Sequence, residues 1–294
     1  MNEAPNRFAV LVNPSAGGGR AAKLLPEASH ALDARGVEHR VVETTSLAHG
    51  CQEARAAAED GEAVVVMSGD GLIGQVGGVL AETGATFGIL PGGRGNDLAR
   101  VLGIPTRIQG AADILAAGRT REIDVGEING KRFLCIASCG FDSDANRLAN
   151  ESHFRGPLVY AWAALRALAR WEAATFTLDF GEEVVQATGY TAAAANSKAY
   201  GGGMYAAPDA VLDDGLLDVG TCGDVSKLRF LRGITQIFKG EHRETMDVRE
   251  WRAPEVRIEA DRPFTVYADG EPITELPATV SVLPRALRII APAP

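Results

Sequence analysis

The chain has 294 residues, of which 46% are hydrophobic and 23% are charged, and its formal net charge is −9. This composition is ordinary for a globular protein and allows one large or two smaller cores. The acidic balance argues against broad nucleic-acid binding, which depends on basic patches that displace counterions. The sequence shows neither a signal-peptide pattern at its start nor an apolar run of membrane-spanning length, so it predicts a cytoplasmic protein.

The first part of the chain alternates between apolar runs and helical patterns. The apolar runs lack polar alternation, which is typical of a parallel sheet covered on both faces. A short helix after residue 95 is expected to be capped by Asn96 or Asp97. Strands are expected over 8–12, 39–44, 63–67 and 86–90, and helices over 16–35, 46–59 and 73–82.

The pattern of expected elements changes after residue 124. Residues 123–138 read as a hairpin around Asn129-Gly130, and from residue 174 onward most segments are strand-like and separated by glycine or aspartate turns. A helix is expected over 226–239, with Ser226 as its cap. The longest helical pattern, 157–171, has apolar residues at three- and four-residue spacing, namely Leu158, Trp162, Leu165, Leu168 and Trp171. The second part is therefore predicted to be mainly antiparallel β structure.

The turn "SGDGLIG" follows the third expected strand. Gly69, Gly71 and Gly74 match G-x-G-x-x-G, but this pattern alone is a weak signal for dinucleotide binding. Asp70 would repel a pyrophosphate at this position unless a cation lay between them. A carboxylate in a phosphate-binding turn therefore favours a site that uses Mg²⁺, held directly or through water.

A second glycine turn, "PGGRGNDLAR", occupies residues 91–100. Its glycines leave backbone N–H groups free to point at phosphate, and a helix start at Asn96-Asp97 would add a favourable dipole. The P-loop pattern G-x-x-x-x-G-K-[ST] is absent. Gly77 and Gly78 each cost about 1 kcal/mol in a helix relative to alanine, which predicts that this helix packs backbone-close against sheet or nucleotide.

Six segments occur in an order that resembles the diacylglycerol kinase catalytic family, which includes bacterial lipid kinases and sphingosine and ceramide kinases. They are "VNPSAGGGR", "SGDG", "PGGRGNDLAR", "GFD", "YGGGMYAAPDAVLDDGLLDV" and "DGE". The resemblance implies an α/β nucleotide-binding domain over 1–127, similar to NAD kinase and phosphofructokinase. It also implies a mainly antiparallel β-sandwich substrate domain over 128–285, with a tail over 286–294 that packs back on the first domain.

The resemblance also implies an ATP site in the cleft between the two domains. Asp70 matches the aspartate of the family's G-G-D-G-T turn, beside the phosphates. The positions that would contact ATP are Asn13, Thr44 or Thr45, Ser68, Gly69, Asp70, Gly71, Gly93, Arg94, Gly95 and Asn96.

Further residues take roles in metal binding and catalysis by the same resemblance. Asp214 would bind Mg²⁺ together with the backbone carbonyls of Val211 and Leu216. Glu271 matches the family's usual candidate general base, and Asp269 in the same D-G-E turn and Asp70 complete the catalytic set. Asp142 would lie near the substrate hydroxyl.

Three positions depart from the family pattern. Ser68 replaces a glycine, Leu72 replaces a threonine and so removes a phosphate-binding hydroxyl, and Arg94 replaces a second threonine. Arginine holds phosphate oxygens bidentately and is always charged, so Arg94 can offset the losses. The same departures are also compatible with an altered nucleotide preference or an inactive kinase.

The sequence therefore predicts an ATP- and Mg²⁺-dependent kinase that phosphorylates a hydroxyl of a lipid such as diacylglycerol, with a role in phospholipid metabolism. Alternatives are a kinase of a soluble alcohol, a catalytically silent nucleotide-binding regulator, an NADP-dependent oxidoreductase that uses Gly69, Gly71 and Gly74, and an NAD-phosphorylating kinase. Helix 157–171 either packs on the β-sandwich or lines an acyl pocket. No nucleic-acid partner is expected, whereas a homodimer and transient membrane association stay open.

Overall fold

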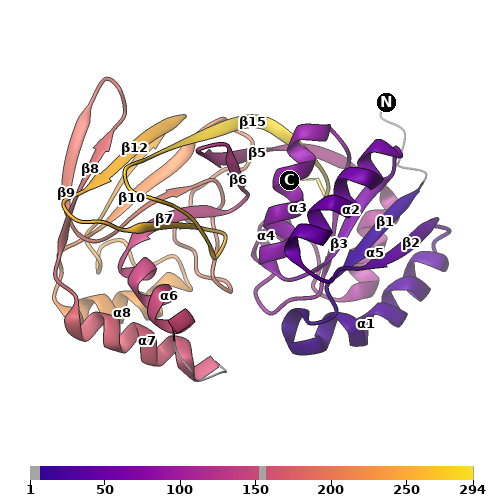
Figure 1. Cartoon of the computed structure of the whole chain (residues 1–294), viewed down its shortest axis with the longest axis horizontal. Coiled ribbons are helices and arrows are strands. Elements are labelled where there is room, and N and C mark those ends of the chain that lie inside the picture. Colours follow the sequence, from indigo (N-terminus) through magenta and orange to yellow (C-terminus); the bar gives the residue numbers. More distant parts are fainter. Residues whose placement is uncertain (1–6, 152–156, 294) are drawn as a thin grey trace.

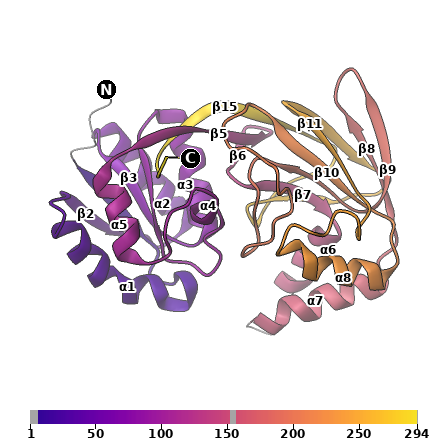
Figure 2. The same ribbon diagram turned by 180° about the vertical axis from the view of Figure 1, so that it is seen from behind.

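The computed structural model describes residues 7–151 and 157–293. They form an N-terminal α/β domain and a C-terminal β domain that lie side by side (Figures 1 and 2). Two long strands, β5 (Thr120–Ile128) and β15 (Ala278–Ile290), pass between the domains. No described helix combines the length and hydropathy that a membrane crossing requires.

The N-terminal domain is built on a parallel sheet with the strand order β2-β1-β3-β4. Its strands are β1 (Phe8–Val12), β2 (His39–Glu43), β3 (Ala63–Ser68) and β4 (Phe87–Pro91). Its helices are α1 (Ala16–Asp33), α2 (Leu47–Glu59), α3 (Asp70–Thr83), α4 (Asp97–Val101) and α5 (Ile108–Ala117). All residues of β1, β3 and β4 are buried, because α1 and α5 cover one face of the sheet and α2 and α3 cover the other. The parallel, doubly covered sheet is confirmed.

Helix α4 does not begin as the sequence predicted. The side chain of Asn96 accepts from the backbone N–H of Gly93 (3.0 Å), and Asn96 itself has a φ of 53°. The N–H groups at the start of α4, those of Asn96 and Asp97, donate instead to the carboxylate of Asp70 at 3.0 and 2.7 Å. The cap therefore comes from another element of the fold, which local spacing cannot reveal.

The C-terminal domain is mainly antiparallel, as predicted. Its main sheet path runs β14-β13-β7-β9-β8-β12-β15, and β10 lies between β9 and β11. Its remaining strands are β6 (Lys131–Phe133), β7 (Ile136–Gly140), β8 (Ala174–Asp179), β9 (Val184–Ala195), β10 (Leu217–Gly223), β11 (Val248–Ala253), β12 (Glu255–Ala260), β13 (Thr265–Ala268) and β14 (Glu271–Glu275). Its helices are α6 (Phe141–Glu151), α7 (Pro157–Arg170) and α8 (Lys227–Ile237).

The expected hairpin and the expected cap of α8 are both present. Asn129 and Gly130 have φ values of 50° and 77° and connect β5 to β6. Asparagine and glycine tolerate this left-handed conformation, so the pair closes a tight turn. The Ser226 Oγ accepts from the N–H of Arg229 at 3.4 Å, at the start of α8.

Helix α7 is more exposed than the sequence indicated. Leu168 and Trp171 are buried, as a packed apolar face requires, but Trp162 is 42% exposed and Leu165 is 58% exposed. The side chain of Leu158 lies outside the described residues. Only part of the apolar pattern over 157–171 therefore faces the β domain.

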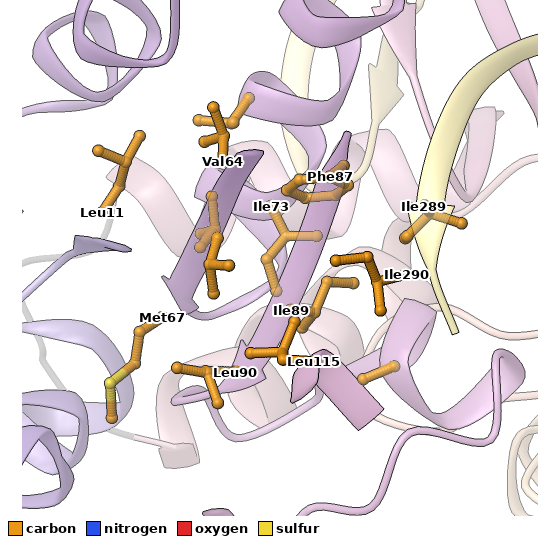
Figure 3. Close-up of a cluster of buried hydrophobic side chains, with 14 of the residues drawn as sticks. Leu11, Val64, Met67, Ile73, Phe87, Ile89, Leu90, Leu115, Ile289 and Ile290 are labelled. Atoms are coloured by element: carbon orange, nitrogen blue, oxygen red, sulfur yellow. The ribbon is translucent and has the colours of Figure 1, made fainter. Parts of the chain in front are cut away.

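The connection between the domains is a broken strand pair. Strand β15 pairs with β5 in two blocks, and the register shifts between Leu283 and Leu287. Beyond the shift, Ile289 pairs with Phe87 of β4. Figure 3 shows Ile289 and Ile290 beside Phe87 and other side chains of the N-terminal core. The last strand of the chain thus belongs to both domains.

A fully buried carboxylate holds this register shift in place. Asp124 on β5 accepts from the N–H of Arg285 (2.7 Å), within the shifted segment, and from the N–H of Gly215 (2.7 Å), in the turn before β10. Hydrogen bonds to a charged acceptor are stronger than neutral ones, and a buried donor that loses its partner is costly. Asp124 therefore fixes the junction between the domains.

We expect Asp124→Ala to destabilise the protein by about 2–5 kcal/mol, because two buried N–H groups would lose their acceptor. Asp124→Asn should cost less, since the amide oxygen retains one acceptor site. The midpoint of urea denaturation measures the effect, and Asp209→Ala, which removes an exposed carboxylate paired with Arg243, is the control. Equal midpoints for Asp124→Ala and the control would refute this role.

Candidate active site

Helix α3 faces the C-terminal domain through its glycines. A Cβ atom at Gly74 would lie 2.8 Å from Oδ2 of Asp269, and one at Gly77 would lie 2.5 Å from the side chain of Leu134. At Gly78 the corresponding neighbour is Arg132, at 3.0 Å. The predicted close backbone approach is confirmed, and its partner is the β6–β7 segment of the other domain. Gly74, the last glycine of the G-x-G-x-x-G pattern, therefore lies at a domain contact.

Three glycine turns meet where β1, β3 and β4 end. A Cβ atom at Gly17 would lie 2.8 Å from the carbonyl oxygen of Gly92, and one at Gly93 would collide with the backbone of Gly69. One at Gly18 would lie 3.2 Å from the guanidinium of Arg94, whose side chain is exposed. Ligands of open α/β sheets bind at this edge, beyond the carboxyl ends of the strands. The three turns form a backbone-lined surface with one arginine beside it. The prediction that the glycines of 91–100 leave their N–H groups free is wrong for Gly92 and Gly93, which donate to the Ser68 carbonyl and to Asn96 Oδ1 at 3.1 and 3.0 Å.

Other predicted nucleotide-binding residues lie around these turns. The Oδ1 of Asn13 accepts from the N–H and the hydroxyl of Ser15 at 3.1 and 2.7 Å, which shapes the chain just before the first glycine turn. The buried Thr44 hydroxyl donates to the carbonyl of Val12 (3.2 Å), so this hydroxyl holds β1 and β2 together. The Thr45 hydroxyl lies 3.2 Å from Nδ1 of His49 and is on the exposed side.

The three departures from the family pattern have different surroundings. Leu72 is buried against α2, where a Cβ atom at Gly50 would lie 2.6 Å from it. Ser68 is buried, and its carbonyl accepts from the N–H of Gly92 at 3.1 Å. Arg94 alone is exposed at the meeting point of the turns. Leu72 thus packs in the core of the N-terminal domain, while Arg94 is available to a ligand.

Asp97 connects the two domains at the base of the cleft. Its Oδ2 accepts from the N–H of Gly202, in a loop of the C-terminal domain, at 2.8 Å. Its Oδ1 is buried and has no hydrogen-bond partner among the described residues. Burial raises the pKa of Asp97, and the neighbouring Asp70 carboxylate raises it further. Two close carboxylates with an unfilled oxygen are an arrangement that a divalent cation would stabilise.

Asp269 fixes the start of β7. Its carboxylate accepts from the N–H groups of Leu134, Cys135 and Ile136 at 2.7, 2.9 and 3.2 Å. Burial raises the pKa of Asp269 to about 6, although these three donors pull it down. Since both oxygens already hold backbone donors, Asp269 is better suited to positioning than to proton transfer. The sequence had grouped it with the catalytic residues.

Asp142, expected near the substrate hydroxyl, lies at the start of α6. The hydroxyl of Ser138 donates to its Oδ2, whereas its Oδ1 is buried and has no partner in the described parts of the chain. Burial raises the pKa of Asp142. A buried acceptor with a vacant lone pair is a place where a ligand hydroxyl can donate a hydrogen bond.

A cavity of about 710 Å³ joins these groups. Asp70, Arg94, Asp97 and Asp142 line one part of it, and the other part extends over the sheet of the C-terminal domain. Its floor consists of alternate residues of four neighbouring strands, which share one face of the sheet: Ile136, Ser138, Thr191, Ala193, Ala195, Asp218, Gly220, Cys222, Val248 and Glu250. Most of these side chains are small, which leaves the space above them open.

The cavity is covered by helices and one loop. Side chains from α6, α8 and the loop after β9 form its roof and walls, namely Phe141, Ala145, Tyr200, Met204, Ala206, Ala207, Phe230, Ile234 and Ile237. These groups are mainly apolar. The cavity therefore combines a carboxylate-rich end at the glycine turns with a long apolar part inside the second domain.

Glu271 and the predicted Mg²⁺ ligand Asp214 have different neighbours. The Oε1 of Glu271 would be 3.6 Å from a Cβ atom at Gly71, so Glu271 lies beside the second glycine turn. Asp214 forms an ion pair with Arg252, and its Oδ1 accepts from the N–H of Leu216 at 3.0 Å. Neither Asp214, Val211, Leu216 nor Glu271 lines the cavity. The carboxylates of 70, 97, 142 and 269 do share it.

Some residues of the site carry no local sequence signal. Ser138 and the interdomain contact of Asp97 escaped the sequence because their partners are identified only by the fold. The alanine run of β9 was visible as "TAAAA", but a strand of small residues indicates no ligand until its alternate positions are seen to line a cavity. Within the described residues, no group of three or more His, Cys, Asp or Glu side chains has metal-binding geometry.

Comparison with known proteins identifies the family. Residues 7–128 match the diacylglycerol kinase catalytic domain, and residues 135–291 match the YegS C-terminal NAD kinase beta sandwich-like domain. A diacylglycerol kinase of Mycobacterium tuberculosis is 38% identical and covers 97% of this chain and 95% of its own. One of Bacillus subtilis is 26% identical over 97% and 96% of the two chains.

Solved structures support the same fold. A putative diacylglycerol kinase from Bacillus anthracis superimposes with a TM-score of 0.84 over 99% of this chain and 97% of its own, at 22% identity. The two-domain architecture expected from the sequence is thus confirmed. With both of its domains matched in order by family models, and with a relative at 38% identity over nearly its whole length, the chain belongs to the diacylglycerol kinase catalytic family and is a lipid kinase.

Proposed function

We propose that this kinase transfers the γ-phosphoryl group of ATP, with Mg²⁺, to a hydroxyl of a diacylglycerol-like lipid whose chain occupies the cavity. One observation carries the proposal. The cavity joins the glycine turns and their carboxylates to a mainly apolar space inside the C-terminal domain. A soluble alcohol would leave that apolar space without a counterpart, whereas an acyl chain would fill it.

The nucleotide phosphates would lie against the glycine turns. The first turn is tightly wound, because Gly17, Gly18 and Gly19 have φ values of 62°, 73° and 87° and the N–H groups of Gly18 and Gly19 donate to the carbonyl of Ser15 at 3.1 and 3.2 Å. The exposed guanidinium of Arg94 supplies a permanent positive charge beside them. Because phosphoryl transfer depends mainly on positioning and charge stabilisation, such a rigid cradle is what the reaction needs.

Asp97 fits a Mg²⁺ ion better than Asp214 does. Asp97 has a buried oxygen with no hydrogen-bond partner in residues 7–151 and 157–293, and its pKa is raised by burial and by Asp70, so a cation would relieve both conditions. Asp214 already has Arg252 as its counter-ion. When bound, Mg²⁺ neutralises charge on the transferring phosphates. The family-implied role of Asp214 and the carbonyls of Val211 and Leu216 stays a prediction.

The acceptor hydroxyl would donate to Oδ1 of Asp142 and so be oriented at the junction of the two parts of the cavity. Two carboxylates are then candidates for taking its proton. Asp70 lines the cavity, and each of its oxygens holds a single N–H donor, which leaves room for another. Glu271 lies outside the cavity lining, beside Gly71. The geometry favours Asp70 as the base over Glu271, the candidate implied by the family.

Labelled ATP incubated with the purified protein and Mg²⁺ tests the substrate class. We expect label to enter a total lipid extract and to be absent from a polar metabolite extract processed in parallel. Label confined to the polar extract would reject a lipid acceptor. Transfer to neither extract, despite ATP binding, would reject the kinase function altogether.

A larger residue on the cavity floor should shorten the accepted chain. Ala193 lies between Ser138 and Gly220 on the floor. We expect Ala193→Leu to lower kcat/KM for long-chain diacylglycerol by about tenfold or more, with short-chain diacylglycerol much less affected, because one or two buried methylenes are worth about 1–3 kcal/mol of discrimination. Thr188→Leu, an exposed position on the same strand, is the control. Equal losses for both chain lengths would contradict the acyl site.

Neutralising the two candidate bases should separate their roles. Asp70→Asn is expected to lower kcat by about 10²- to 10⁴-fold, and Glu271→Gln by less than about tenfold, as measured with saturating ATP and lipid. Because Asp70 also caps α4, thermal unfolding and ATP-Mg²⁺ binding of both variants must be compared with wild type. A large loss only in Glu271→Gln would transfer the base role to Glu271.

Asp97→Asn tests the metal assignment by binding rather than turnover. Titration calorimetry with a non-hydrolysable ATP analogue should show that Mg²⁺ strengthens binding to wild type, and that this Mg²⁺ dependence falls by about 10- to 100-fold in Asp97→Asn. Asp214→Asn is the matched variant and should keep the dependence. The reverse result, with loss only in Asp214→Asn, would restore the site implied by the family.

A further inference from the structure

Helices α7 and α8 carry an unusual share of exposed apolar side chains. Ten large hydrophobic residues are exposed among the described residues, and five of them lie on α7, on α8 or directly after α8. These five are Trp162 (42% exposed), Leu165 (58%), Leu228 (81%), Leu231 (37%) and Phe238 (50%). Scattered single residues of this kind are normal, but such a concentration marks an interaction site.

The two helices meet where α7 ends and α8 begins. The Nζ of Lys227, at the start of α8, donates to the carbonyl of Ala169, near the end of α7, at 2.9 Å. Figures 1 and 2 both show the helices next to each other along one edge of the C-terminal domain. We define the α7–α8 surface by its exposed residues, namely Trp162, Leu165, Arg166, Arg170, Lys227, Leu228, Leu231, Arg232 and Phe238.

This surface is basic in an acidic protein. The helices contain the basic residues Arg166, Arg170, Lys227, Arg229 and Arg232 and no acidic residue, whereas the whole chain has a net charge of −9. The guanidinium of Arg166 lies 5.1 Å from the ring of Trp162, so charge and aromatic surface are paired. Apolar and aromatic side chains flanked by lysine and arginine are the composition of helices that lie in the interface of an anionic bilayer.

A hollow of about 400 Å³ lies next to α7 and adds to the positive charge. Its lining includes four arginines, Arg147, Arg166, Arg170 and Arg262, against two acidic residues, Asp144 and Glu172. The guanidinium of Arg262 lies 4.8 Å from the ring of Trp171, which holds it in place. Arginine clusters of this kind suit phosphate groups, which a bilayer supplies in its headgroup layer.

Helix α8 also borders the lipid cavity. Phe230, Ile234 and Ile237 on its inner side line the cavity, while Leu228 and Leu231 point outward. One helix thus separates the apolar part of the cavity from the exposed α7–α8 surface. A lipid acceptor comes from a membrane, so contact at this surface would bring the cavity to its source.

We propose that the α7–α8 surface docks on the headgroup layer of an anionic lipid bilayer, with Trp162, Leu165, Leu228, Leu231 and Phe238 in the interface and the basic residues against anionic headgroups. The proposal rests on the lipid-kinase function, because a lipid acceptor must be taken from a membrane. The docking itself requires no turnover, so it can be measured apart from the reaction.

Vesicle flotation tests the proposal. The full chain is mixed with vesicles of phosphatidylcholine containing about 30 mol % phosphatidylglycerol, and with pure phosphatidylcholine as the neutral case. We expect binding to the anionic vesicles that weakens with added salt, and at least about tenfold weaker binding to the neutral ones. Equal binding to both, or binding to neither, would overturn the proposal.

Exposed positions allow variants that leave the fold intact. Leu165→Glu with Leu228→Glu should reduce binding by about tenfold or more, and Arg170→Glu with Arg232→Glu should abolish its salt dependence. Val184→Glu, 60% exposed on β9 and outside the surface, is the control and should bind like wild type. If the surface variants bound the vesicles as well as Val184→Glu does, the α7–α8 surface would be rejected as the docking site.

Two further measurements separate rival explanations. Turnover of short-chain diacylglycerol presented in detergent should be unchanged in Leu165→Glu with Leu228→Glu, whereas turnover of vesicle-embedded substrate should fall. A parallel loss in detergent would reject the docking role and point to damage of the reaction itself. A second copy of the chain is the other partner that could cover this surface, and sedimentation velocity tests for it. If the wild type is a dimer that the same variant dissociates, the surface belongs to a chain–chain interface instead.

Discussion

Buried and half-buried carboxylates that accept backbone N–H groups hold the cleft of this kinase together. Asp70 binds the start of α4, Asp269 binds the start of β7, and Asp124 binds the register shift of β15 together with the turn before β10. A buried charge without partners is costly, so each of these aspartates is stable only when the loop that supplies its donors is in place. The same bonds order segments that have no hydrogen-bonding ladder of their own. Asp97 extends the pattern across the cleft to Gly202, so the carboxylates set the relation of one domain to the other.

These carboxylates differ in how many hydrogen-bond donors they hold, and the difference indicates their roles. Asp269 and Asp124 have backbone donors on both oxygens and therefore act as fixed points of the structure. Asp97 and Asp142 each retain a buried oxygen without a hydrogen-bond partner in the part of the chain that the structure describes, and burial raises the pKa of both. Unsatisfied buried acceptors are rare in native proteins, and a ligand, an ion or an ordered water is a common partner for them. In the proposed function, the vacant oxygens of Asp97 and Asp142 would receive ligand, whereas Asp269 and Asp124 hold the scaffold.

The sequence predicted what depends on neighbours along the chain and missed what depends on neighbours in space. Ser46 caps α2 and Asn129-Gly130 closes the hairpin, because each signal and its partner lie within a few residues. The glycines of α3 predicted a close contact correctly, but the contacting residues, Leu134 and Arg132, follow some fifty residues later. The cap of α4 was assigned to Asn96 or Asp97, yet it comes from Asp70. Periodicity over 157–171 likewise could not tell the buried Leu168 from the exposed Leu165, since a helix face looks the same in sequence whether protein or lipid covers it.

Helix α8 lies between the apolar part of the cavity and the exposed α7–α8 surface. A diacylglycerol-like substrate must keep its chain out of water from the membrane to the active site, because every exposed methylene costs about 0.8 kcal/mol. A cavity that opened only through the polar cleft would expose the chain during entry. In this fold the wall that bounds the apolar part of the cavity is also the helix that bears Leu228 and Leu231. The glycine turns lie at the other end of the same cavity, in the N-terminal domain, where they form a polar, backbone-lined surface. In the proposed function, the two-domain architecture would let one enzyme join an aqueous nucleotide to a lipid acceptor that stays in an apolar environment.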